Sequence, residues 1–233
     1  MSDWYKTGED ADKAIEEEAV RQEEARKSGG KLQRYWMPPN NKQGDQQHYL
    51  TFLDGLTHPE GFSSPFTFME HQLKLNGHWR NWFTCIEGLV IDGKKQSCPL
   101  CAAGENPSLM AAYSVIDHTE FTDKKGNTRS KEVRLFVCKS QVQGALKKAA
   151  KKKKGLRGWH VEVTRTGSDA ASTGNSFDFE ERFDEEEFQK KFGVELPQPP
   201  DYREIFAPMK PEELEAKIAG RNVDVEGEER IRY

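Results

Sequence analysis

The chain has 233 residues, of which 35% are hydrophobic and 32% charged, and its formal net charge is −4 at pH 7. This length suits one sizeable domain with appendages, and no apolar run approaches the length of a membrane span. The acidic N-terminus is unlike a signal peptide, which begins basic and continues apolar. We therefore expect a soluble, cytoplasmic protein without membrane contact.

Charge is divided unevenly along the chain. Residues 1–30 carry five Lys/Arg and nine Asp/Glu, residues 31–165 carry 21 and 12, and residues 166–233 carry nine and 18. A basic middle between acidic ends predicts a polyanionic partner for the middle segment. The alternative is that surface charge simply varies along the chain.

The N-terminal arm comes first in the chain. Residues 9–27 are rich in helix-forming residues and end at Ser28-Gly29-Gly30, which predicts a polar helix followed by a hinge. With few apolar residues to bury, residues 1–30 are interpreted as an acidic helical arm that packs weakly. The arm could contact neighbouring copies, although an inert solvated arm is the simpler interpretation.

A strand-rich domain is predicted for residues 31–181. Alternating apolar and polar residues, punctuated by turn residues, predict strands at His48–Asp54, Phe66–Leu75, Trp79–Ile86, Leu109–Asp117, Lys131–Lys139, Trp159–Thr166 and, more briefly, Ser176–Glu180. A short helix is expected at Ser140–Gly155. The pattern predicts a mostly β fold, an OB-fold-like Greek-key barrel of five to six strands with an inserted metal loop. An immunoglobulin-like sandwich would not place a helix before the last strong strand.

Residues 182–233 are acidic and interrupted by prolines. We expect an extended acidic tail with little core of its own, apart from a weak amphipathic helix at 211–219. Such an untethered tail could visit a basic binding cleft and compete with a polyanion.

A metal site is predicted around Cys98-Pro-Leu-Cys101, because two thiolates three residues apart can bind one ion from a single turn. Cys85 precedes this pair and supplies a third thiolate. Of the two histidines nearby, His71 is preferred because it should lie within a strand, whereas His78 follows the Asn-Gly turn signal. Three cysteines and one histidine suit a structural Zn²⁺.

Free buried cysteines are the alternative to this metal site, since they are common in reduced proteins. Cys138 lies among apolar residues of a predicted strand and is interpreted as a core thiol.

Several motifs in fixed order carry a family resemblance. RYWMPP, FLDG, PFTFMEHQLKLNGHWRNWFTC, CPLCAAGENPSL, YSVIDHTEFTDKKG, LFVCK and VTRTG, which lie between Arg34 and Phe179, resemble the single-stranded DNA-binding (helix-destabilising) proteins of tailed bacteriophages. The resemblance implies an OB fold with a structural zinc bound by His71, Cys85, Cys98 and Cys101. It also implies coating of single strands during phage DNA replication, recombination and repair in the host cytoplasm.

The resemblance further implies protein partners. The family's acidic tail recruits replication proteins, and cooperative self-association on DNA is an accompanying expectation. The last residues here, Glu-Glu-Arg-Ile-Arg-Tyr, are mixed in charge, so the tip departs from the family pattern.

A binder that tolerates any sequence needs cations for phosphates and flat side chains for unpaired bases. The expected cations are Arg34, Lys74, Arg80, Lys131, Arg134 and Lys139. The expected stacking residues are some of Tyr35, Trp36, Trp79, Trp82, Phe83, Tyr113 and Phe121. Each has a core or surface role as its alternative, and the face with Arg80 and Trp82 is the favoured stacking platform.

Two other functions remain open at this point. His58-Pro59-Glu60 with the Cys98/Cys101 pair loosely resembles a zinc nucleobase deaminase, but Ser97 stands where that signature has proline and Cys85 is left unexplained. A zinc-ribbon interaction protein or transcription factor is the second alternative, and preference for duplex DNA would favour it. We therefore expect a non-enzyme.

Overall fold

The structure is a computed structural model that describes residues 32–37, 46–55, 57–58, 61–62, 65–75, 78–122, 128–167 and 170–219. The chain divides into two compact units, Met1–Gln33 and Arg34–Tyr233. The predicted N-terminal helix lies outside the described residues. None of the helices described is both long and apolar enough to cross a membrane.

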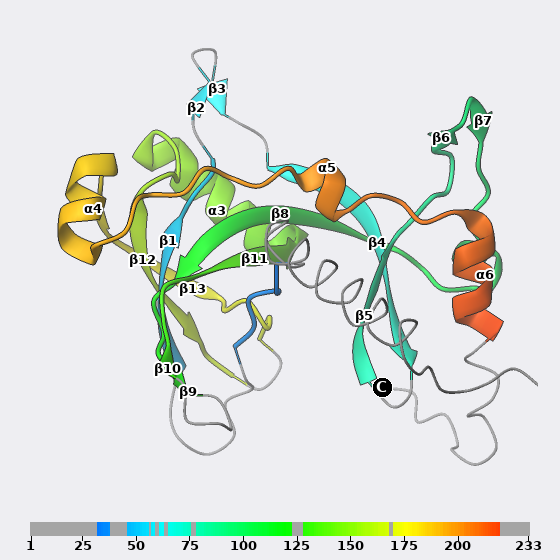
Figure 1. Ribbon diagram of the computed structural model, residues 1–233, viewed down its shortest axis with the longest axis horizontal. Helices are drawn as coiled ribbons and strands as arrows, with labels where there is room; N and C mark the ends of the chain where they lie inside the picture. The colour runs from blue at the N-terminus through cyan, green and yellow to red at the C-terminus, as the bar shows by residue number, and fades with distance from the viewer. Residues whose placement is uncertain are drawn as a thin grey trace, which may run out of the picture. The chain divides into compact units, whose positions relative to one another are not determined.

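A seven-stranded antiparallel sheet forms the body of the second unit (Figure 1). Its strands are β1 (Gln46–Phe52), β4 (Phe66–Leu75), β5 (His78–Thr84), β8 (Ser108–Asp117), β11 (Glu132–Lys139), β12 (Trp159–Arg165) and β13 (Ser176–Arg182). They are ordered β13-β12-β1-β8-β4-β5, and β11 also pairs with β8. The prediction of a mostly β fold is confirmed.

Short hairpins and helices complete the unit. The hairpins are β2 (Thr57–His58) with β3 (Gly61–Phe62), β6 (Val90–Ile91) with β7 (Lys94–Lys95), and β9 (Phe121–Thr122) with β10 (Thr128–Arg129). The helices are α2 (Pro99–Ala102), α3 (Ser140–Lys153), α4 (Glu185–Phe192), α5 (Tyr202–Ile205) and α6 (Pro211–Ala219). Helix α3 lies between β11 and β12, as predicted.

The predicted barrel does not close through strand pairing among the described residues, because β13 and β5 end the sheet order. The reason is that β8 changes its partner along its length: its first half pairs with β4 and its second half pairs with β1. Strands β4 and β5 therefore form a separate hairpin arm. An extended segment, 34–37, partly bridges the remaining gap, since Tyr35 N donates to Leu135 O at 2.8 Å and Met37 N donates to Ser172 O at 2.7 Å.

Alternation along segment 34–37 explains how it docks. Tyr35 and Met37 point into the core beside Phe52 and Phe136, whereas Trp36 is 46% exposed. Gly174 lies where this segment meets β12: its φ is +85°, and a Cβ there would lie 2.4 Å from Val163 Cγ1. Only glycine allows this approach without displacement.

The prediction of an extended tail after Arg182 is wrong for its described part. Helix α4 has a capping box at Asp184 and Glu187 and buries Phe188 completely. Farther along, the centroid of the Phe206 ring lies 4.2 Å from that of the Phe68 ring, and Leu214 of α6 is fully buried. Sparse apolar residues thus fasten an otherwise acidic segment to the body, because each supplies buried apolar surface.

A polar contact also holds this segment. The Tyr202 hydroxyl donates to the Asp54 carboxylate, and Ser114 donates to the same oxygen from its backbone N at 2.8 Å and from Oγ at 3.0 Å. Burial raises the pKa of Asp54 to about 6, although the hydrogen bonds from Tyr202 and Ser114 oppose the rise. The carboxylate therefore anchors α5 but is costly to ionise inside the fold.

This raised pKa makes stability depend on pH with a definite sign. Between about pH 4 and pH 6 the folded state binds the Asp54 proton more tightly than the unfolded state does, so this contribution to the free energy of unfolding falls as pH rises. We expect the difference between wild type and Asp54→Asn to change by up to about 3 kcal/mol across this window. Urea denaturation at several pH values measures it. The exposed Asp178→Asn serves as control, and an Asp54→Asn curve parallel to wild type would contradict the assignment.

Candidate metal centre

The β4–β5 hairpin positions the first two ligands. His71 lies on β4 opposite Phe83 of β5, on the face that also buries Leu73. Cys85 follows β5 directly, and its backbone N donates to Met69 O at 2.8 Å. Histidine and cysteine are therefore carried by neighbouring strands that are hydrogen-bonded to each other.

The tight β6–β7 hairpin leads the chain back toward His71 and Cys85. Asp92 and Gly93 form the two-residue connection between β6 and β7 with φ values of 51° and 75°, as a type I′ turn requires. Glu87 Oε2 then accepts a hydrogen bond from Cys98 N at 2.8 Å. Pro99 starts the single turn of α2 that presents Cys98 and Cys101 on the same side.

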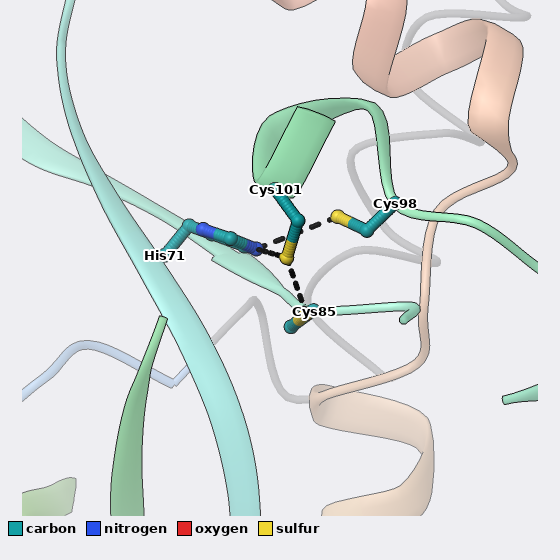
Figure 2. Close-up of side chains that lie close together, drawn as sticks. All are labelled: His71, Cys85, Cys98 and Cys101. Atoms are coloured by element: carbon teal, nitrogen blue, oxygen red, sulfur yellow. Dashed lines mark hydrogen bonds between the residues drawn. The ribbon is translucent and has the colours of Figure 1, made fainter. Parts of the chain in front are cut away.

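The four side chains converge, as Figure 2 shows, with all their ligand atoms within 4.8 Å of one another. His71 Nε2 lies 3.4 Å from Cys98 Sγ and 3.7 Å from Cys101 Sγ, and Cys85 Sγ lies 3.6 Å from Cys101 Sγ. Tetrahedral zinc with ordinary bond lengths separates its ligand atoms by about 3.5–3.8 Å. The predicted set of four is thus brought together, and it could hold a metal ion such as zinc.

The surroundings favour a metal over unrelated thiols. The 3.6 Å between Cys85 Sγ and Cys101 Sγ is far longer than the about 2.05 Å of a disulfide bond. Cys98 is fully buried and Cys85 is 6% exposed. Exclusion from solvent alone does not explain why three buried or half-buried sulfurs meet at one point. Cys138 lies elsewhere, buried in β11 within the main core, which confirms its interpretation as a core thiol.

Ionisation of the ligands is tuned unequally. Burial opposes a Cys98 thiolate, but hydrogen bonds from the backbone of Cys101, Ile86 and Leu100 outweigh it and lower the pKa of Cys98. Burial, followed by the neighbouring Cys85 and Cys98 thiols, raises the pKa of Cys101 to about 12. A divalent cation would supply the positive charge that stabilises the thiolate form of these crowded cysteines.

His71 is held in the form that binds metals. Burial lowers its pKa, which favours the neutral imidazole. Its Nδ1 is buried without a hydrogen bond of normal geometry, although the Glu105 backbone lies close enough to act on the ring's pKa. With Nε2 facing the sulfurs, Glu105 is placed to orient the ring from the second nitrogen.

An apolar shell closes the site. Leu73, Ile86 and Leu100 are buried around the cysteines, and Leu214 of α6 completes the cluster. Sequence reasoning missed Leu214 and Phe206 because isolated apolar residues in an acidic segment give no clear period. It also passed over the Asp-Gly turn signal at 92–93 that builds the loop.

Arg34 and Trp82 lie together outside this shell. The guanidinium carbon of Arg34 is 4.3 Å from the centroid of the half-buried Trp82 ring. Glu70, which is 5% exposed, binds the same guanidinium through both carboxylate oxygens. Trp82 pairs across the hairpin with Gln72, and Glu70 pairs with Thr84, so this is the face of the hairpin opposite His71.

The other predicted DNA contacts are divided. Trp36, Lys74 and Lys139 are exposed. Tyr35 and Tyr113 are each 3% exposed within the main core, so the core alternative holds for both and neither ring can stack on a base. The reason is strand alternation, which turns both tyrosines inward.

Phe83 packs half-buried against the metal cluster rather than beside Trp82. Lys131 donates to Phe192 O at 2.7 Å, and Arg134 pairs with Glu132, so both cations have protein partners. The side chains of Trp79, Arg80 and Phe121 lie outside the described residues.

Comparison with known proteins gives no assignment: no protein-family model matches the chain, and no curated protein matches it significantly.

Removing one ligand should release the metal. We expect about one zinc per wild-type chain and loss of most of it in Cys98→Ser, together with a lower melting temperature, because metal binding energy is folding energy in such a loop. Elemental analysis after gel filtration measures the zinc. Cys138→Ala, which alters a buried thiol outside the cluster, should keep its metal. Full zinc in Cys98→Ser would refute the ligand set.

Removing the metal should also loosen α6. Leu214 fills a site built partly by Cys85, Cys98 and Leu100, so we expect chelation to abolish hydrogen-exchange protection in α6. Helix α4 is the internal control, because Phe188 packs with Leu53 and Ile116 instead. Unchanged α6 protection, or equal loss in both helices, would contradict this coupling.

Proposed function

We propose that this protein binds single-stranded DNA with little sequence preference and that zinc, held by His71, Cys85, Cys98 and Cys101, has a structural role. Four protein ligands fill a tetrahedral site and leave no position for a substrate, which supports structure over catalysis. We also interpret the sheet as a variant of the OB fold, because α3 lies between β11 and β12.

One arrangement carries the DNA-binding proposal. Arg34 and Trp82, which are in contact, and the exposed Trp36 and Lys74, which follow Arg34 and Gln72 by two residues on the same sides of their segments, make up what we call the Arg34–Trp82 face. Arg34 and Trp36 share a side of segment 34–37 because the intervening Tyr35 points into the core. Cations and flat rings side by side are what an unpaired strand requires.

The position of this face ties it to the metal. Trp82 lies on β5, three residues before Cys85, and its cross-strand partner Gln72 follows His71 directly. Zinc on one face of the hairpin would therefore fix the geometry of the rings on the other. Glu70 adds a second constraint by holding Arg34 over Trp82.

Long-range charge supports the same partner. Residues 31–165 carry 21 Lys/Arg against 12 Asp/Glu, which would attract a polyanion during encounter. The first turn of α4 presents Glu185, Glu186 and Glu187 to solvent while Phe188 anchors the helix. We propose this exposed acidic surface as a contact for other proteins of replication or recombination.

Binding should favour single strands and depend steeply on salt. A labelled oligothymidylate and a duplex hairpin are compared by fluorescence anisotropy at several salt concentrations. We expect Trp36→Ala to weaken oligothymidylate binding by about 1–3 kcal/mol, the usual contribution of one stacked base.

Tyr49→Ala is the matched control, because Tyr49 is an exposed aromatic that lies beside Glu162 on another part of the sheet. It should bind like wild type. Equal affinity for duplex and single strand would instead favour a zinc-ribbon type of duplex reader.

A further inference from the structure

Helix α3 carries an unusually high density of positive charge. Within Ser140–Lys153 there is no acidic residue, and the exposed lysines of its second half are Lys147, Lys148, Lys151 and Lys152. We call these four residues the α3 lysine surface. Lys147 and Lys151, like Lys148 and Lys152, are spaced i, i+4, so like charges face each other on successive turns.

The fold offsets this repulsion only in part. Lysines near a helix C-terminus interact favourably with its dipole, and the Lys153 ammonium lies 4.3 Å from the centroid of the Trp159 ring. Among the described residues, no ion pair forms at the α3 lysine surface. Each like-charged i, i+4 pair destabilises the helix, and a bound polyanion would remove that repulsion.

A groove adjoins these lysines. It encloses about 390 Å³ between α3 and β13, with Ala149 and Lys152 on the helix side and Phe177 and Phe179 on the strand side. Both phenylalanines are half-buried, and small alanines leave the helix flank open. A lysine on the helix wall and aromatic rings on the strand wall repeat the chemistry of the Arg34–Trp82 face.

The two surfaces are carried by different elements of the fold. Strand β13 ends one side of the strand order, and β5, which carries Trp82, ends the other. Helix α3 packs on β8 and β11, not on the metal hairpin. A strand that engages both surfaces must therefore be longer than one that engages the Arg34–Trp82 face alone.

We propose that the α3 lysine surface is a second binding surface for the phosphates of single-stranded DNA, engaged by strands long enough to reach beyond the Arg34–Trp82 face. This inference rests on the proposed function. An acidic peptide is the competing occupant, because β13 is an edge strand that could accept another strand. However, such a peptide would run alongside Asp178 and Glu180, whose charges oppose it. A nucleic acid strand can follow the outer side of α3 instead.

The test compares two oligothymidylates in Lys148→Gln/Lys152→Gln. Glutamine has nearly the helix propensity of lysine, so the fold should persist. One oligonucleotide has about 6 nucleotides, near the lower limit of OB-fold site sizes, and the other has about 30. For the long strand we expect the slope of log binding constant against log salt concentration to become less steep by about 1.4, at about 0.7 for each phosphate that is no longer neutralised. We also expect its affinity to fall on the order of tenfold at about 0.1 M salt. Binding of the short strand should not change.

Lys94→Gln/Lys95→Gln is the matched control, since it removes two exposed lysines from β7 and should leave both strands bound as in wild type. An equal fall in affinity in the two double variants would show that only net charge matters and would overturn the proposal. So would an unchanged long-strand slope in Lys148→Gln/Lys152→Gln. If that variant fails to bind polyglutamate but binds DNA as wild type does, the surface belongs to an acidic peptide. If wild type binds neither oligonucleotide, the proposed function itself fails.

Discussion

The convergence of one imidazole and three thiols organises the hairpin arm and the segments packed on it. The four ligand atoms lie within 4.8 Å of one another, yet they come from β4, from the residue after β5 and from the turn of α2. The apolar cluster around the cysteines is small, with Leu73, Ile86, Leu100 and Leu214 as its buried side chains, so hydrophobic burial alone is a limited source of order there. A tetrahedral ion would fix all three segments at once, and its binding energy would appear as stability of the hairpin arm.

Two further features depend on that arm. On its far face, Arg34 lies between the Trp82 ring and the Glu70 carboxylate. On its near face, Leu214 fills the cluster around Cys85 and Cys98. The segment from α4 to α6 thus runs from the main sheet to the metal loop, anchored by Phe188, Tyr202, Phe206 and Leu214 in turn. The metal loop and the main sheet are joined by this segment as well as by β8.

Local patterns predicted the strands and the convergence of His71 with three cysteines well, because strand alternation and the Cys-x-x-Cys spacing are properties of short segments. His71 could be chosen over His78 from its place in a strand. Patterns failed where the outcome depends on distant contacts. Tyr35 and Tyr113 are as aromatic as Trp36, and only the packing of Phe52 and Phe136 decides that they are buried. The prediction of an extended acidic tail was wrong for the same reason, since the sites that receive Phe206 and Leu214 exist only in the folded body.

We propose that zinc on one face of the hairpin orders a strand-binding surface on the other. The most direct measurement is the affinity of one preparation for labelled oligothymidylate before chelation, after chelation and after addition of Zn²⁺. We expect binding to weaken on chelation and to return with zinc, while circular dichroism shows that the main sheet stays folded. Metal-free protein that binds the oligonucleotide as tightly as the zinc-loaded form would contradict it.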